Sequence, residues 1–125
     1  MTQSRCRTIL LVEDDADSRE AMTALLEGCG YAVTSATNGH EALELLRTAP
    51  RPGLILLDLM MPGMNGFQFR EEQIKDPEAA AVPVILTSAH GKLQHETAAL
   101  GVAGYLEKPI DVQRLLDTVE RYCAT

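Results

Sequence analysis

The 125-residue sequence has little of several features that define whole classes of protein. Its three cysteines, Cys6, Cys29 and Cys123, form no CxxC pair, so we expect neither a disulfide framework nor a zinc site, but plain thiols that are mostly buried. Its longest apolar runs, Ile9–Val12 and Leu54–Leu57, are far shorter than the ~20 residues that cross a bilayer. Because the polar N-terminus also differs from a signal peptide, we expect a cytoplasmic protein without membrane insertion.

Basic residues are also scarce. The chain has 11 Lys and Arg against 18 Asp and Glu, a net charge of -7, so we expect no direct binding of nucleic acid. The hydrophobic content of 46% is enough for a folded core, and a chain of this length is the size of one ordinary domain. We therefore expect a single domain over residues 1–125, with its core at about 7–123.

Short apolar runs alternate with amphipathic segments along the whole chain. Periodicity and turn residues predict strands at Thr8–Val12, Tyr31–Ala36, Leu54–Leu57, Val82–Thr87 and Gly104–Leu106. The first, third and fourth of these have the composition of buried strands. Helical spacing predicts one helix ending at Gly28–Gly30, one before Pro50, and one after the cap Asp111. Helices at 65–75, ending at Asp76–Pro77, and at 92–100 are inferred mainly from the strands on either side.

This alternation predicts an α/β fold, with a doubly wound five-stranded parallel sheet and helices on both faces. In such sheets, ligands bind beyond the carboxyl ends of the strands. Polar residues follow four of the predicted strands: Glu13-Asp14-Asp15, Asp58, Thr87-Ser88 and Lys108-Pro109. We expect these residues to converge at one edge of the sheet.

Three carboxylates at one edge would repel each other unless a cation lay among them, and oxygen ligands suit Mg²⁺. Mg²⁺ commonly bridges carboxylates to a phosphate. An aspartate can act as a nucleophile that forms an acyl phosphate, and Lys108 and Ser88 have the groups to bind phosphoryl oxygens. The residue types thus favour phosphoryl chemistry with Mg²⁺ as cofactor.

At this point the sequence resembles the receiver domain of two-component response regulators, including single-domain chemotaxis regulators. The resemblance covers nearly the whole chain and rests on four stretches in the right order: Ile9–Asp15, Leu54–Gly66, Pro83–Ala89 and Gly104–Pro109. It implies the flavodoxin-like strand order 2-1-3-4-5. No output domain fits in this chain, which leaves open a stand-alone receiver or one taken from a larger regulator or hybrid kinase.

The resemblance also implies a role for each site residue. Asp58 would be the phosphorylated aspartate, Glu13 and Asp14 the acidic pair that holds Mg²⁺ with Asp58, and the backbone carbonyl of Met60 a further metal ligand. Lys108 would bind the phosphoryl group and precede Pro109 through a cis peptide bond. Further roles fall on Ser88, the switch hydroxyl, and Tyr105, an aromatic ring that moves inward when that hydroxyl shifts.

The implied function is a signalling one rather than that of a turnover enzyme. A histidine kinase or a histidine phosphotransfer protein would donate the phosphoryl group. A downstream protein would then bind a surface at about 90–100, 104–108 and 111–122. The main alternative is a receiver-like interaction module that works without phosphorylation. A flavodoxin-type protein is disfavoured by the acidic loop at 13–15, and an aspartate-nucleophile phosphatase by Met60, which stands where that class has a second aspartate.

Overall fold

The computed structural model describes residues 8–48, 51–61, 63–88 and 101–123, without the side chain of residue 123. Its centre is one sheet of five parallel strands in the order β2-β1-β3-β4-β5. The strands are β1 (Thr8–Val12), β2 (Ala32–Ala36), β3 (Leu54–Asp58), β4 (Val84–Ser88) and β5 (Gly104–Glu107). The fold class and the strand order expected from the sequence are confirmed.

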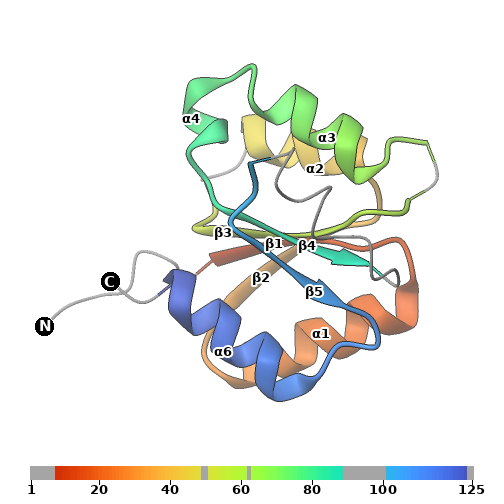
Figure 1. Ribbon diagram of the computed structural model, residues 1–125, viewed down its shortest axis with the longest axis vertical. Helices are drawn as coiled ribbons and strands as arrows, with labels where there is room; N and C mark the ends of the chain where they lie inside the picture. Colours follow the sequence, from red (N-terminus) through yellow and green to blue (C-terminus); the bar gives the residue numbers. More distant parts are fainter. Residues whose placement is uncertain (1–7, 49–50, 62, 89–100, 124–125) are drawn as a thin grey trace, which may run out of the picture.

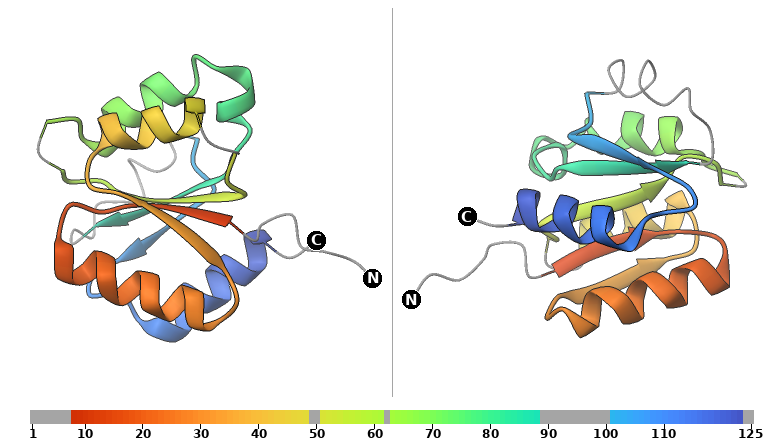
Figure 2. Two further views of the ribbon diagram at one scale, coloured as in Figure 1. Left: turned by 180° about the vertical axis from the view of Figure 1, so that it is seen from behind. Right: turned by 60° about the horizontal axis from the view of Figure 1, so that its bottom comes forward.

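Helices cover both faces of the sheet, as Figure 1 shows, and Figure 2 shows the same layers from two further directions. One layer consists of α1 (Ala16–Gly28) and α6 (Val112–Cys123), and the other of α2 (Gly39–Thr48), α3 (Gly66–Gln73) and the short α4 (Pro77–Ala80). None of the helices in the described ranges has the length and apolar character needed to cross a membrane.

The side chains of the central strands alternate between two apolar cores. Leu10 and Leu57 belong to the core under α2 and α3, whereas Leu11 and Leu56 belong to the core over α1 and α6. All five residues of β3 are buried, as are the last four of β1. All five residues of β4 are buried as well, and because each buried leucine or isoleucine contributes roughly 1.5–3 kcal/mol, these three neighbouring strands supply much of the stability of the fold.

Polar side chains at the helix ends fix where the chain leaves the sheet. Asp15 caps α1 by accepting a hydrogen bond from the Ser18 amide. The side chain of Asn65 and that of Gln68 form a reciprocal capping box at the start of α3. These bonds satisfy amide groups that have no partner within the helix, and they set the entry angle of both helices beside the loops that follow β1 and β3.

The structure corrects three expectations. Asp76 and Pro77 do not only end α3: they begin α4, because the Asp76 side chain accepts from the Glu78 amide and proline suits the first helical position. The strand expected from Val82 begins at Val84. Cys29 is exposed rather than buried, because it lies beyond the end of α1. Cys6, the side chain of Cys123 and the helix expected at 92–100 lie outside the described residues.

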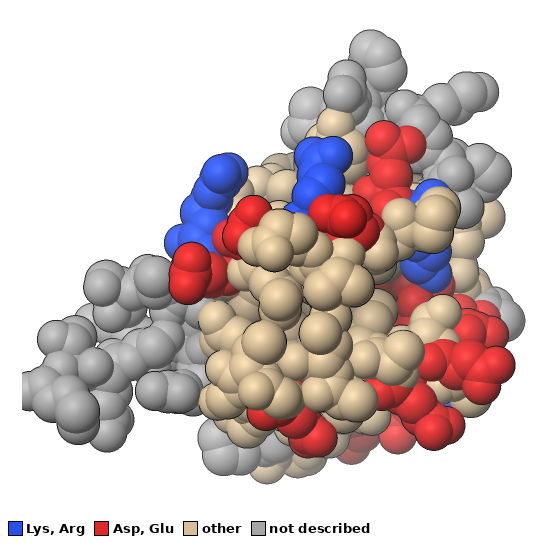
Figure 3. All heavy atoms as spheres, turned by 90° about the horizontal axis from the view of Figure 1, so that it is seen from below, with Lys and Arg blue, Asp and Glu red and all other residues tan. Residues whose placement is uncertain are grey.

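Acidic side chains dominate the rim of the layer formed by α1 and α6. Figure 3 looks at the molecule from below and shows Asp and Glu around the margin, with other residues in the middle. The Lys and Arg side chains visible on this face lie beside acidic ones rather than together.

Candidate functional site

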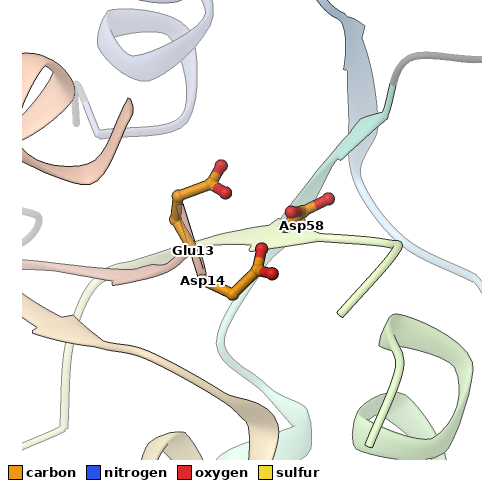
Figure 4. A group of neighbouring side chains, drawn as sticks. All are labelled: Glu13, Asp14 and Asp58. Atoms are coloured by element: carbon orange, nitrogen blue, oxygen red, sulfur yellow. The ribbon is translucent and has the colours of Figure 1, made fainter. Parts of the chain in front are cut away.

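The site lies at the carboxyl ends of β1 and β3, the two neighbouring strands at the centre of the sheet. Glu13 and Asp14 directly follow β1, and Asp58 is the last residue of β3. Parallel pairing of Val12 with Leu57 brings these three residues to the same edge. Carboxylate oxygens of all three lie within 4.8 Å of one another, and Figure 4 shows the side chains extending beyond the two strand ends. The sequence-based prediction that they converge is confirmed.

Backbone contacts hold the strand ends in place. The Glu13 amide donates to the Ala36 carbonyl (3.1 Å), and the Leu59 amide donates to the Thr87 carbonyl (2.9 Å). At Gly66 a Cβ atom would lie 3.0 Å from the Leu59 Cα, so only glycine allows α3 to start this close to the residue after Asp58. The acidic residues therefore sit on a rigid base.

Lys108 follows β5 and reaches the same carboxylates from the other side of β4. Its amide donates to the Ser88 carbonyl (2.7 Å), and its peptide bond to Pro109 is cis. Its ammonium group donates to Glu13 Oε1 (3.0 Å) and to Asp58 Oδ2 (3.2 Å). Glu13 is 2% and Asp58 4% exposed, so Lys108 forms ion pairs with two buried carboxylates.

The site is electrostatically unbalanced. Burial, followed by the neighbouring charge of Glu13, raises the pKa of Asp58 to about 6, although Lys108 and the Met60 amide act in the opposite direction. Partial burial acts to lower the pKa of Lys108, but the hydrogen bond to Glu13 and the charges of Asp58 and Glu13 outweigh it and raise that pKa. Three ionised carboxylates and one ammonium leave a formal charge of -2 at the site.

The three carboxylates differ in how they are held. Both oxygens of Glu13 accept hydrogen bonds, from Lys108 and from the Asp15 amide (3.1 Å). Both oxygens of Asp58 also accept, from Lys108 and from the Met60 amide (3.2 Å). Asp14 is exposed, and no donor within the described ranges bonds its carboxylate. Asp14 thus offers the most accessible oxygen atoms for an incoming cation.

The remaining predicted residues lie on β4, on β5 and just after β3. Ser88 is 1% exposed at the end of β4, and Thr87 beside it is also buried. Tyr105, in β5, is partly buried against the core on the α3 side of the sheet. Met60 extends its side chain into solvent, with 60% exposure, while its amide faces Asp58.

One residue of the site was missed by sequence reasoning. Arg19, in the first turns of α1, donates through Nη1 to the Glu13 carbonyl (2.9 Å) and, at longer range, to the Asp14 carbonyl (3.4 Å). A signal was present, because a cation near the N-terminus of a helix is opposed by the helix dipole and needs another reason to be there. Its partners could not be predicted, because every residue has a backbone carbonyl and the sequence does not show which of them Arg19 contacts.

Comparisons with known proteins agree with this geometry. The family model for the response regulator receiver domain matches residues 9–120. Protein PilH of Pseudomonas aeruginosa is 36% identical over 118 residues, which cover 93% of this chain and 97% of PilH.

Two solved structures show the same fold. The chemotaxis protein CheY4 of Vibrio cholerae superposes with a TM-score of 0.86 at 29% identity, covering 94% of this chain and 98% of that one. The receiver domain of the sensor histidine kinase PA1611 of Pseudomonas aeruginosa, solved with a magnesium ion in its active-site cleft, gives 0.85 at 28% identity, covering 96% and 99%. Both the family model and the relatives span nearly all of the sheet and its helices, and the chain therefore belongs to the response regulator receiver domain family.

Proposed function

We propose that this chain accepts a phosphoryl group on Asp58, with Mg²⁺ bound at the acidic cluster, and that the phosphorylated form presents an altered protein-binding surface. The observation that carries the proposal is the cluster of Glu13, Asp14 and Asp58, in which Glu13 and Asp58 are buried, Asp14 is exposed and Lys108 bonds to the two buried carboxylates. The membership of the receiver domain family supports it.

The donor set fits a divalent cation. Mg²⁺ prefers oxygen ligands and is usually held by one or two carboxylates with waters completing its shell. Asp14 is open, Asp58 lies beside it, and a charge of +2 would balance the excess negative charge of the cluster. Glu13 bonds Lys108 through Oε1 and the Asp15 amide through Oε2, and we propose that it anchors Lys108 and reaches the ion directly or through a water molecule. The Met60 carbonyl remains our proposed backbone ligand.

The chemistry needs few protein groups. An oxygen of Asp58 attacks the phosphorus of a phosphohistidine, the new P–O bond forms as the P–N bond breaks, and the electron pair of that bond stays on the imidazole nitrogen of the donor. The bound cation supplies charge neutralisation for the phosphoryl oxygens. Lys108, 3.2 Å from Asp58 Oδ2, is placed to bond one of those oxygens, and the low exposure of Asp58 limits the access of bulk water to its carboxyl group.

The change is transmitted, we propose, through Ser88 and Tyr105. Ser88 ends β4, the strand next to β3, and Tyr105 lies on the following strand, β5, where it pairs with Leu86 of β4. A hydroxyl that moves toward a new phosphoryl group vacates space beside β5, and Tyr105, only partly buried, is placed to respond. The receiving surface would include β5 and α6 together with residues 90–100, which lie outside the described residues. The donor would be a histidine kinase or a phosphotransfer protein.

Intact-mass analysis tests the acceptor directly. The protein is incubated with acetyl phosphate and MgCl₂, and we expect one added phosphate on the wild type, none on Asp58→Ala, and none on the wild type in EDTA. Asp117→Ala, an exposed aspartate on α6, is the matched control and should be phosphorylated like the wild type.

A different result would favour the alternative reading. If the wild type takes up no phosphate and binds neither Mg²⁺ nor beryllofluoride, the chain is an interaction module that works without phosphorylation. If phosphate appears equally on Asp58→Ala, the acceptor is another residue and the assignment of Asp58 is wrong.

A further inference from the structure

Hydrogen bonds to the Asp14 side chain do not explain how its carboxylate is oriented. Glu13 and Asp58 are each fixed by donors on both carboxylate oxygens, whereas no donor in the described part of the chain bonds the Asp14 carboxylate. Asp14 is also exposed and lies in a loop between β1 and α1. The backbone conformation at Asp14, which fixes the direction of its Cα–Cβ bond, is therefore the main restraint on its carboxylate that the described residues provide.

Arg19 contacts the backbone on both sides of Asp14. The Glu13 carbonyl belongs to the peptide group before Asp14, and the Asp14 carbonyl to the one after it; both face Nη1 of Arg19, at 2.9 and 3.4 Å. Two peptide planes define the φ and ψ angles of the residue between them. One guanidinium nitrogen thus restrains the conformation of Asp14.

Arg19 is itself well placed to act as a fixed point. Its amide donates to the Asp15 carbonyl (2.9 Å) in the first turn of α1, which Asp15 caps. Its side chain is only partly exposed. The position near the positive end of the helix is unfavourable for a cation, and bonds to two carbonyl oxygens offset that cost.

We propose that Arg19 is a positioning residue for the cation site: it holds the loop at Glu13 and Asp14 in the conformation that directs Asp14 at the metal. The proposal rests on the Mg²⁺ binding proposed above. This role predicts that loss of Arg19 weakens Mg²⁺ binding, which is the opposite of what the loss of its charge alone would do. The guanidinium is positive and repels a divalent cation, so removing it would strengthen Mg²⁺ binding if loop geometry played no part. Weaker binding in its absence would reflect the lost geometry.

The test is a titration of ¹⁵N-labelled protein with MgCl₂, followed by amide chemical shifts. We expect Arg19→Met to raise the Kd for Mg²⁺ about tenfold or more, as is typical when a residue that orients a metal ligand is lost. Arg19→Lys keeps the charge but replaces the planar guanidinium group with a single ammonium group. Its Kd should lie between those of the wild type and Arg19→Met. Arg121→Met, an exposed arginine on α6, removes the same charge elsewhere and should leave the Kd within about twofold of wild type.

The same spectra separate the possible failures. An Arg19→Met protein that is folded and binds Mg²⁺ as tightly as the wild type, or more tightly, overturns the positioning role while leaving the proposed function intact. If that variant does not fold, Arg19→Lys decides, and an unchanged Kd in it overturns the role. A wild type that shows no saturable Mg²⁺ binding refutes the proposed function and this inference together.

Discussion

Asp58 is a buried carboxyl group whose surroundings oppose its ionisation. A carboxyl with a higher pKa in the folded than in the unfolded chain binds more protons when folded, so stability falls as the pH rises between the two values. Here those values are 3.8 and about 6. In protein free of divalent cations, Asp58 is protonated below about pH 4 in both the folded and the unfolded chain and does not lower the free energy of unfolding. Above about pH 6 it is ionised in both, and the free energy of unfolding is lowered by the full cost of the buried charge.

The substitution Asp58→Asn should remove this penalty. In EDTA at pH 7.5 we expect the variant to be more stable than the wild type by about 1–2 kcal/mol, less than two full pKa units would give, because water near the cluster screens the charges. At pH 4 the difference should vanish. Urea unfolding followed by circular dichroism measures both values, with Asp117→Asn as the control for loss of an exposed charge. If the difference in the free energy of unfolding between Asp58→Asn and the wild type is the same at both pH values, the raised pKa of Asp58 is wrong.

At this scale the sequence revealed residue types but not their contacts. The positions of Glu13, Asp14, Asp58 and Lys108 were predictable because each follows a strand with a clear apolar pattern. The double hydrogen bonding of Glu13 was not, because one of its partners is a backbone amide two residues ahead and the other is Lys108, 95 positions away.

At the scale of elements, the residues that α3 buries explain why its sequence has only a weak apolar stripe. Its buried positions are Gly66, Phe69 and Gln73, of which only Phe69 is recognisably apolar. Gln73 is 1% exposed and donates to the carbonyls of Ala79 (2.8 Å) and Val82 (3.3 Å), beyond α3. A glutamine in a core position conceals the helical period of α3, whereas α4, with four residues, is too short to show a period at all.

Gln73 should be a strong determinant of stability. Gln73→Leu keeps a similar volume but leaves two buried carbonyls without this donor and removes the acceptor of Arg70 Nη1. We expect a loss of about 2 kcal/mol in the free energy of unfolding. Gln113→Leu, on the exposed side of α6, is the matched control and should change it by less than about 0.5 kcal/mol. Greater stability in Gln73→Leu would show that apolar burial outweighs these bonds.

For the whole molecule, the fold was the most predictable property. Four-residue apolar runs at 9–12 and 54–57 identify the central strands, and parallel connections then leave few arrangements of the rest. Periodicity does not reveal the strand order, which was predicted from the resemblance to receiver domains. The order is confirmed by the pairing of β1 with β2 and β3, of β3 with β4, and of β4 with β5.

Binding of Mg²⁺ should stabilise the molecule as a whole. A ligand that binds only the folded state adds about 1.4 kcal/mol for each tenfold rise in concentration above its Kd. We expect chemical unfolding of the wild type to shift accordingly with MgCl₂, and Asp14→Asn to show little shift. NaCl at equal ionic strength is the control for screening; if it produces the same shift, the effect is not specific binding.

The two halves of the site are attached to parts of the sheet with different support. The carboxylates follow β1 and β3, each paired on both sides, whereas Lys108 follows β5, the last strand in the order and paired with β4. A strand paired along one side yields more easily than one held along two. We therefore expect the carboxylates to move less than Lys108 when the charge of the site changes. If Asp58 is phosphorylated as proposed, we expect the added charge to displace the edge of the sheet, so that a local chemical event would become a movement at the molecular surface.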